Sequence, residues 1–447
     1  MKTSFRHILQ GLCVLAVLLI GSTHSTASTT SHVDSMISLK SASTKLIYID
    51  GKPETPADRL AEQDSMIRVI STFYYDQFRH FQDPNAPYFL FMSKEAGLTM
   101  GIGGCVRMRA YYDWNGAMPS SAFAPYTIPI PANPLSMRHF ATTPAGTGLF
   151  FRVIGNNRLL GDYQLYIETD FSGYQSRGLK LKKAYAMFRD FTIGYANSTF
   201  SDPAAQPVCI DAGGSTNKFS NTSVLVRYMP CFRKKWYVGV SLETPGSAID
   251  QTETNVQPRT DWLPDVAGLL QYEWARGQHV RLSGILRTLP YRDMILQKNH
   301  NVVGWGAYLS SVAHPAGALT TYANISIGRG IAGLGGDMKY GKYDLIVDPF
   351  NNTLLYTPLS IGWCAGIQYN FRPNFFISLA ASQMHLKMRD HSPADEYKNG
   401  TLAWATAYWS ILPRVDVAAE LDFGRRVNIS NEARNAWRAN LMCSFSF

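Results

Sequence analysis

Hydrophobic and polar positions alternate over long stretches of this chain. In the segment "MGIGGCVRMRAYYDW", one parity carries mostly apolar residues, while the other carries Arg107, Arg109 and Asp113. Because successive side chains of a β-strand point to opposite faces, this alternation predicts a strand with one apolar and one polar face. Two arginines on one face are costly in a dry core but natural in a water-filled lumen.

Segments with the same alternation recur through the rest of the chain. We count about sixteen of them, an even number of the kind found in bacterial outer-membrane barrels. They lie near 97–114, 147–154, 160–172, 177–188, 190–196, 221–229, 235–245, 264–275, 277–289, 302–312, 318–329, 356–371, 374–386, 399–411, 413–426 and 434–447. A soluble sandwich shows the same periodicity, so alternation alone does not separate the two architectures.

The connections between these segments do separate them. Short turns, such as those at Gly155 and Leu412, alternate with long segments, such as those that follow Trp114 and Leu289. This sorting matches the short periplasmic turns and long extracellular loops of a membrane barrel. The sequence therefore predicts an all-β fold, an antiparallel transmembrane β-barrel of about 16 strands over residues 97–447.

The long segment 197–220 follows the fifth predicted strand and forms the third loop on the long-loop side. A barrel of this size leaves an aqueous channel unless something narrows it. We keep two arrangements open for this loop. It folds inward as a constriction, with Asp202 and Asp211 as candidates for its acidic face, or it is an ordinary exposed loop.

Composition agrees with a membrane barrel. Of the 447 residues, 46% are hydrophobic, 13% are aromatic and only 17% are charged. After the N-terminus, no apolar run approaches the roughly 20 residues of a membrane helix. The formal net charge of +9 is scattered, without blocks of Lys or Arg, so nucleic acid is not an expected partner.

The N-terminal residues indicate export. A basic start is followed by an apolar run and then by small residues, which predicts a signal peptide over 1–27 that is cleaved after Ala27. We interpret 28–96 as a periplasmic segment that is partly helical, because apolar residues between Met66 and Phe78 fall near helical spacing. A plug that enters the lumen and a disordered leader remain open alternatives.

The cysteines of the mature chain are odd in number and widely spaced, which does not indicate a disulfide framework. We interpret most of them as small hydrophobic residues. A bridge between Cys209 and Cys231 stays open.

The polar parity of the predicted strands supplies candidate pore-lining charges. Arginine binds carboxylates in a two-point manner, and rings of such charges set the selectivity of a pore. The basic candidates are Arg107, Arg109, Arg152, Lys180, Lys182, Arg227, Arg281, Arg287 and Arg438, and the acidic candidates are Glu168, Asp170, Glu243, Glu273, Asp416, Glu420 and Asp422. The main candidates for a basic ladder are Arg107, Arg109, Arg281 and Arg287. We expect about half of these charges only to form salt bridges that stabilise the wall.

Enzymatic chemistry is not expected. Gly328, Gly330 and Gly333 have the spacing of a dinucleotide-binding loop, but they leave a predicted strand and no helix signal follows. The ten histidines show no metal-ligand spacing, so neither a metal nor a cofactor is predicted. No nucleophile elbow or catalytic triad stands out, which leaves a barrel hydrolase, or a surface receptor over a closed pore, as a weaker alternative.

Several blocks resemble the successive strands of a known family, the DcaP-like (dicarboxylate) outer-membrane porins. These blocks are "LKLKKAYAMFRDFTIGYANSTFSD", "DWLPDVAGLLQYEWARGQHVRLSGILRTLPYRD", "GWGAYLSSVAHP", "ISIGRGIAG" and "WSILPRVDVAAELDFGRR". The similarity extends from about Gly97 to Phe447. The family carries a coiled coil before its barrel, whereas the corresponding stretch here is short and poorly heptadic.

The resemblance implies a homotrimeric channel in the bacterial outer membrane. It also implies passive diffusion of small anionic solutes such as dicarboxylates. A plugged, gated transporter of a specific or more hydrophobic solute is the alternative.

The last predicted strand carries aromatic residues up to Phe447. A terminal aromatic of this kind resembles the signal that the barrel-assembly machinery reads in outer-membrane proteins, and we expect Phe447 to act in this way. The expected partners are therefore this machinery, outer-membrane lipid, small anionic solutes and further copies of the chain. To close the barrel, the last strand must pair with the first.

Overall fold

The computed structural model describes residues 45–49, 89–93, 98–116, 118, 120–172, 178–246, 249, 255–260, 263–275 and 277–447. The predicted signal peptide and the predicted helix between Met66 and Phe78 lie outside these residues. Within them, no helix is both long and apolar enough to cross a membrane.

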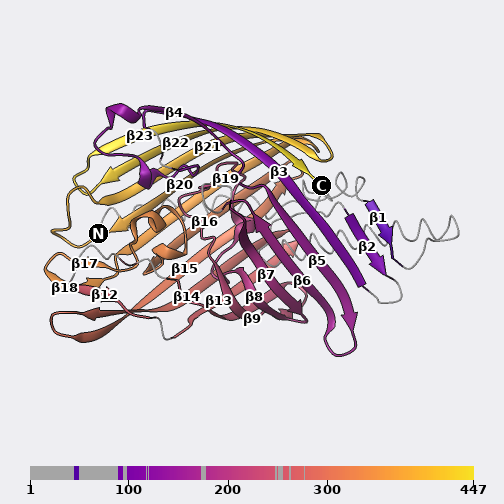
Figure 1. The fold of residues 1–447 in the computed structure, drawn as a ribbon, viewed down its shortest axis with the longest axis horizontal. Coiled ribbons are helices and arrows are strands. Elements are labelled where there is room, and N and C mark those ends of the chain that lie inside the picture. The colour runs from indigo at the N-terminus through magenta and orange to yellow at the C-terminus, as the bar shows by residue number, and fades with distance from the viewer. Residues whose placement is uncertain are drawn as a thin grey trace.

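Sixteen antiparallel strands form a closed barrel (Figure 1). The barrel strands are β3 (Leu98–Trp114), β5 (Gly148–Asn157), β6 (Gly161–Asp170), β7 (Lys180–Phe188), β8 (Phe191–Asn197), β9 (Thr222–Tyr228), β11 (Trp236–Glu243), β13 (Asp265–Ala275), β14 (Gln278–Asp293), β15 (Lys298–Ala316), β16 (Leu319–Arg329), β19 (Leu359–Arg372), β20 (Phe375–Lys387), β21 (Tyr397–Leu412), β22 (Val415–Asn428) and β23 (Ala433–Ser446). Each corresponds to one of the alternating segments of the sequence, so the predicted fold class is confirmed.

Shorter elements accompany the barrel. The short strands are β1 (Lys45–Tyr48), β2 (Phe89–Ser93), β4 (Arg138–Thr143), β10 (Cys231–Phe232), β12 (Val256–Pro258), β17 (Ile346–Asp348) and β18 (Asn351–Tyr356), and the 3-10 turns are η1 (Pro125–Thr127), η2 (Pro134–Ser136), η4 (Pro203–Ala205), η5 (Ala332–Leu334) and η6 (Asp337–Gly341). The strands β1 and β2 pair in parallel, within the segment 28–96 that the sequence predicted to be partly helical.

The first and last barrel strands close the barrel along one seam. β23 pairs with β3 from Trp437 opposite Trp114 to Ser446 opposite Cys105. The backbone of Phe447 then exchanges two hydrogen bonds with Gly104, at 2.9 and 2.8 Å. Beyond this point β2 takes over the same edge of β3. The pairing between first and last strands that the sequence required is therefore present.

Long connections gather at one end of the barrel, and short turns gather at the other (Figure 1). Three long ones are named here loop 1 (residues 115–137), loop 3 (198–221) and loop 6 (330–358). The prediction of a long loop after Leu289 is wrong, because β14 and β15 remain paired as far as Asp293 and Lys298. Ladder hydrogen bonds can extend a hairpin beyond the membrane, where no lipid imposes an alternating pattern.

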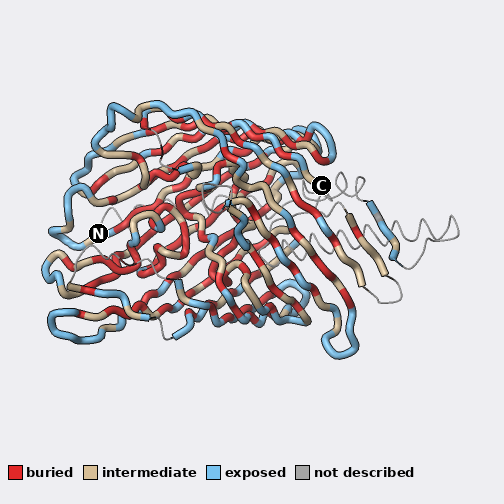
Figure 2. Tube along the Cα trace, viewed as in Figure 1, coloured by how far each residue is buried: buried red, intermediate tan, exposed pale blue. Residues whose placement is uncertain are grey.

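The two faces of the wall differ as the alternation predicts (Figure 2). On the outer face of β3, the side chains of Val106 and Met108 are 58% and 62% exposed. On the inner face of the same strand, Arg109 is 2% exposed. The largest fully buried side chains include Arg152 and Arg227. An apolar outer face with a polar inner face is the arrangement of a membrane barrel.

The seam supplies a stability prediction at Gly104. A Cβ atom at this position would lie 2.5 Å from the carbonyl oxygen of Gly148 and 2.9 Å from the Phe447 ring. We expect Gly104→Ala to lower the free energy of unfolding by about 1–3 kcal/mol, because backbone cannot yield as a flexible side chain can. The urea midpoint of the heat-modifiable folded form measures this.

Gly284→Ala is the matched control, because its Cβ would come no closer than 3.8 Å to the Gly306 carbonyl oxygen. Equal midpoints for the two variants would contradict the close packing at the seam.

Candidate functional site

Loop 3 lies inside the barrel and contacts several parts of the inner wall. Near its start, Asp202 contacts β14 and β15. In its middle, the backbone N–H groups of Ile210 and Asp211 donate to Glu420 of β22. Towards its end, the N–H of Thr216 donates to Ser382 of β20 at 3.0 Å. The loop therefore crosses the lumen from one side of the wall to the other.

The first anchor of loop 3 is Asp202, which is fully buried. Its Oδ2 lies 2.8 Å from His279 Nε2 and accepts from the Ser310 hydroxyl at 2.6 Å, while Oδ1 lies 3.3 Å from Arg281 Nη1. Burial opposes ionisation of Asp202, but the charge of Arg281 and the contacts with His279 outweigh it and lower the pKa of the carboxyl. The loop is thus held here by an ionised carboxylate.

The second anchor is Asp211. Its Oδ2 lies 2.7 Å from Arg109 Nη1 and 3.0 Å from Arg438 Nη1, while Oδ1 accepts from the N–H groups of Phe123 and Gly213. Burial raises the pKa of this carboxyl, yet the two guanidinium groups outweigh burial and the net shift is downward. Because Phe123 belongs to loop 1, this anchor ties loops 1 and 3 to the seam strands β3 and β23.

Arg438 also spans the seam itself. Its Nε and Nη2 donate to the two oxygens of Asp113 at 2.6 and 2.9 Å, which is a two-point contact. Asp113 lies opposite Arg438 in the ladder between β3 and β23. The same guanidinium therefore joins the first strand, the last strand and loop 3.

A third anchor holds loop 6. Arg287 of β14 lies 3.0 Å from Asp265 and 3.3 Å from Asp344, and it also donates to the carbonyl oxygen of Gly330 at 2.6 Å. Asp344 and Gly330 both belong to loop 6. The sequence could not reveal this pair, because Asp344 lies in a loop without periodicity.

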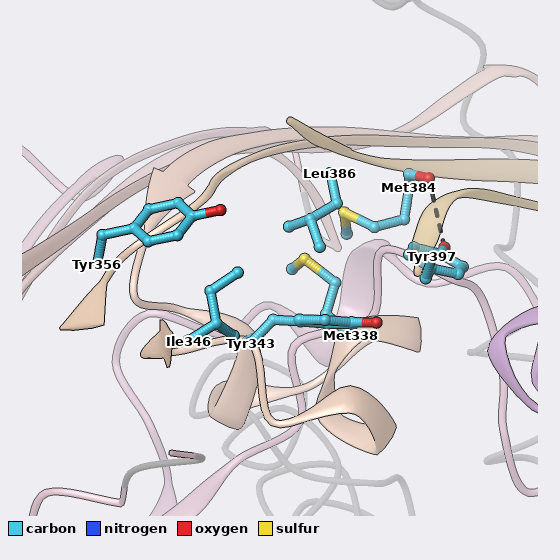
Figure 3. Packing of buried hydrophobic residues seen from close by; sticks show 8 residues of the cluster. Met338, Tyr343, Ile346, Tyr356, Met384, Leu386 and Tyr397 are labelled. Carbon is cyan, nitrogen blue, oxygen red and sulfur yellow. Dashed lines mark hydrogen bonds between the residues drawn. The ribbon is translucent and has the colours of Figure 1, made fainter. Parts of the chain in front are cut away.

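Loop 6 also packs an apolar cluster against the wall (Figure 3). Met338 of η6 is buried together with Met384 and Leu386 of β20. Beside it, Asp337 accepts from the Tyr397 hydroxyl at 2.6 Å and from the Tyr126 N–H at 2.9 Å. Burial raises the pKa of Asp337 to about 6, because it outweighs these two hydrogen bonds and the charges of Arg426 and Lys339.

The remaining predicted charges fall into two groups. On β6 and β7, Lys182 lies 3.2 Å from Glu168 and 3.6 Å from Asp170, while Lys183 lies 3.3 Å from Glu168. Strict alternation did not predict Lys183 as an inner residue. The register shifts between Glu168 and Thr169, and this irregularity brings both Lys182 and Lys183 to Glu168. Lys180 pairs in register with Asp170 and is exposed.

The second group lies on other strands. The Arg152 guanidinium lies 4.7 Å from the centre of the Tyr166 ring, and Arg227 Nη1 donates to the Asn197 carbonyl at 3.3 Å. Glu243 accepts from the Thr199 N–H at 2.8 Å. The other two acids are Asp416, which accepts from the Ser410 hydroxyl at 2.6 Å, and Glu273, which is half-buried on β13.

Arg107 differs from the other main candidates for the basic ladder. Arg109, Arg281 and Arg287 all pair with carboxylates, whereas Arg107 is half-buried and forms no ion pair with any described residue. Its Nε is buried without a hydrogen bond. The structure thus brings most of the expected ladder together with loop acids and sets Arg107 apart.

The bridge that the sequence left open between Cys209 and Cys231 is not formed, and both thiols are free. Cys209 lies in loop 3, whereas Cys231 lies on β10 at the short-turn end. The distance between these two parts of the fold explains the absence of a bridge.

Comparisons with known proteins agree with this architecture. The model of the DcaP outer membrane protein family matches residues 96–447, which confirms the family that the strand blocks indicated. The fold is similar to the crystal structure of the outer membrane channel DcaP of Acinetobacter baumannii, with a TM-score of 0.68 and 18% sequence identity over 80% of this chain and 99% of that chain. A comparison with curated proteins found no match.

Two further structures share the fold at low identity. The anion-selective porin from Comamonas acidovorans has a TM-score of 0.53 and 9% identity, over 78% of this chain and 100% of that chain. The loop L8 deletion mutant of OmpT from Vibrio cholerae has a TM-score of 0.51 and 9% identity, again over 78% of this chain and 100% of that chain. These matches concern the fold alone.

The first anchor predicts a pH-dependent loss of stability. Asp202→Asn leaves Arg281 buried without its carboxylate, so we expect the free energy of unfolding at pH 7 to fall by about 3 kcal/mol. Because the folded-state pKa of Asp202 is lowered, wild type has this stabilisation above about pH 4, the ordinary pKa, and loses it as the pH falls further. Thermal unfolding in detergent at pH 7 and pH 3 measures the difference.

Asp162→Asn is the control, because Asp162 is exposed on β6. A difference between wild type and Asp202→Asn that is the same at both pH values would refute an ionised anchor.

Asp337 predicts the opposite pH dependence. Its raised pKa means that the folded state holds a proton between about pH 4 and about 6 that the unfolded chain has lost. We expect its contribution to stability to fall as the pH rises through this window and then to stay constant. Asp337→Asn cannot ionise, so relative to wild type it gains stability between pH 4 and pH 7 in the same thermal assay.

Asp390→Asn in an exposed loop position provides the comparison. A stability difference between wild type and Asp337→Asn that does not change over this pH range would argue against a buried, protonated Asp337.

Proposed function

The chain belongs to the DcaP outer membrane protein family, and we propose that it is a narrow, passive diffusion channel for small anionic solutes that carry carboxylates. That it is an outer-membrane channel follows from the family and from the porin fold. The class of solute is the further step. Arg107 carries it, because a half-buried guanidinium on the inner face, without an ion pair among the described residues, can bind a carboxylate in two-point fashion.

The ion pairs at the anchors support this proposal, because they neutralise most of the inner arginines but not Arg107. At the anchors, Arg281 is offset by Asp202, and Arg287 is offset by Asp265 and Asp344. Charges that are engaged with a loop present little field to a passing solute. The positive charge of Arg107 is not engaged in this way, and it lies on the same inner face as Arg152.

The anchored loops support the narrow channel. Loops 1, 3 and 6 each place buried side chains against the inner wall, at Phe123, Phe200 and Met338 respectively. A lumen occupied by three loops admits only small solutes. Loop 3, with Asp202 and Asp211 as its anchors, is the proposed constriction.

We extend the proposal to a homotrimer. The outward faces of β20, β21 and β22 carry small side chains, including Ala381, Ala403, Ala405 and Ala419. Small side chains let two barrel walls approach closely, and large ones would hold them apart.

Single-channel recording in a planar bilayer tests the proposal. We expect openings in groups of three and a reversal potential, under a salt gradient, that reports anion preference. Arg107→Gln removes the unpaired guanidinium, so the ratio of anion to cation permeability falls by about twofold or more. Arg372→Gln, an exposed arginine at the short-turn end, leaves the ratio unchanged.

Cation preference in wild type would overturn the anionic solute class. An equal effect of Arg107→Gln and Arg372→Gln on the permeability ratio would show that Arg107 does not set the anion preference. Single rather than triple openings would count against the trimer.

A further inference from the structure

A thiol and two carboxylates meet where the middle of loop 3 touches the wall. Cys209, Glu420 and Asp422 each offer one ligand atom, and these atoms all lie within 4.8 Å of one another. The Cys209 Sγ lies 3.5 Å from Glu420 Oε1. Glu420 and Asp422 share the inner face of β22, because they are two residues apart on one strand.

Glu420 is fixed in place as an acceptor. Its Oε2 accepts from the Ile210 N–H at 2.7 Å and from the Thr406 hydroxyl at 2.6 Å, and its Oε1 accepts from the Asp211 N–H at 2.8 Å. These three donors fix the positions of both carboxyl oxygens. A ligand oxygen beside Cys209 is therefore already positioned.

One carboxyl oxygen of Asp422 has no hydrogen-bond donor among the described residues. Its side chain is 1% exposed, and Oδ2 accepts from the Asn440 amide at 2.7 Å. Its Oδ1 is buried and has no hydrogen-bond partner among the described residues, and neither does the Asn440 Oδ1. A buried oxygen left in this way costs about 1–3 kcal/mol, more when it is charged, so its presence points to a group that is missing from the protein itself.

The charges around this point do not balance. The connected cluster holds the carboxylates of Asp113, Asp211, Glu420 and Asp422 against the guanidinium groups of Arg109 and Arg438. Even with Lys218, whose charge acts on the Cys209 thiol, three cations face four carboxyl groups, so one of these groups holds a proton unless a further cation binds. A divalent cation can take the place of that proton.

We propose that Cys209, Glu420 and Asp422 bind a zinc ion that fastens the middle of loop 3 to β22. The ion replaces the thiol proton: the S–H bond breaks, the proton leaves to solvent, and the sulfur electron pair forms the bond to Zn²⁺. A thiolate ligand selects zinc over Mg²⁺ and Ca²⁺, which take oxygen ligands.

The distances fit this ion. With a Zn–S bond of about 2.3 Å and a Zn–O bond of about 2.0 Å, tetrahedral geometry places sulfur and oxygen about 3.5 Å apart. Cys209 Sγ and Glu420 Oε1 have this separation. Asp422, whose ligand oxygen lies within 4.8 Å of the other two atoms, is the third ligand, and the fourth position is left to water. The proposal concerns the hold on loop 3 and stands independently of the solute class.

Co²⁺ is the probe, because a thiolate bound to it gives a charge-transfer absorption band in the near ultraviolet. Full-length protein in detergent, stripped of metal, is titrated with Co²⁺ and then with Zn²⁺. We expect one equivalent per chain and loss of the band when Zn²⁺ displaces Co²⁺. Cys209→Ser abolishes the band, and Asp422→Asn weakens binding by about tenfold or more.

Cys231→Ser is the matched control, because this thiol is exposed and remote from loop 3. No band in wild type, or a band that survives Cys209→Ser and disappears in Cys231→Ser, would overturn the site.

A second measurement needs no variant. Zn²⁺ is expected to slow the reaction of Cys209 with a maleimide by about tenfold or more, while the reaction of Cys231 is unchanged, as mapped by mass spectrometry of peptides. Equal rates at Cys209 with and without Zn²⁺ would refute the proposal even if the substituted proteins fail to fold.

Discussion

Buried guanidinium groups that hold loops 3 and 6 are paired with carboxylates, and this requirement organises the inside of the barrel. Removing one partner of a buried ion pair leaves an uncompensated charge, which costs several kcal/mol. Loops that lack regular structure are held in the lumen by supplying the carboxylates that wall arginines need. The pairs are Asp202 with Arg281, Asp211 with Arg109 and Arg438, and Asp344 with Arg287. Wall and loops therefore depend on each other.

The same requirement decides which charges are left for a solute. An arginine that holds a loop cannot also offer its full charge to a passing carboxylate, so a simple count of inward arginines overstates the field in the pore. Arg281 and Arg109 serve the loops. Arg107, one β-strand repeat away from Arg109, is on the same face but outside those pairs. Loop anchoring at Arg109 is thus separated from the neighbouring Arg107, which forms no ion pair with any described residue.

The sequence predicts the strands because lipid and lumen act on every residue of the wall, which makes the alternation continuous. Sequence-based prediction fails where neither the lipid nor the water of the lumen imposes the alternating pattern. The bulge that brings Lys183 to Glu168 leaves no mark in composition, and β14 extends to Asp293 by backbone pairing alone. Partners such as His279 for Asp202 are distant in the chain, so no local pattern encodes them. Candidate charges were predictable, whereas their pairing was not.

The two anchors of loop 3 differ in what they need from outside the protein. At Asp202, Arg281, His279 and Ser310 satisfy the carboxylate from within the chain. Around Asp211 the wall supplies two guanidinium groups to four carboxyl groups, so charge balance there requires that a carboxyl group takes up a proton or that a cation binds from solution. The start of the loop is therefore held by the protein alone, while the hold on its middle depends on the medium.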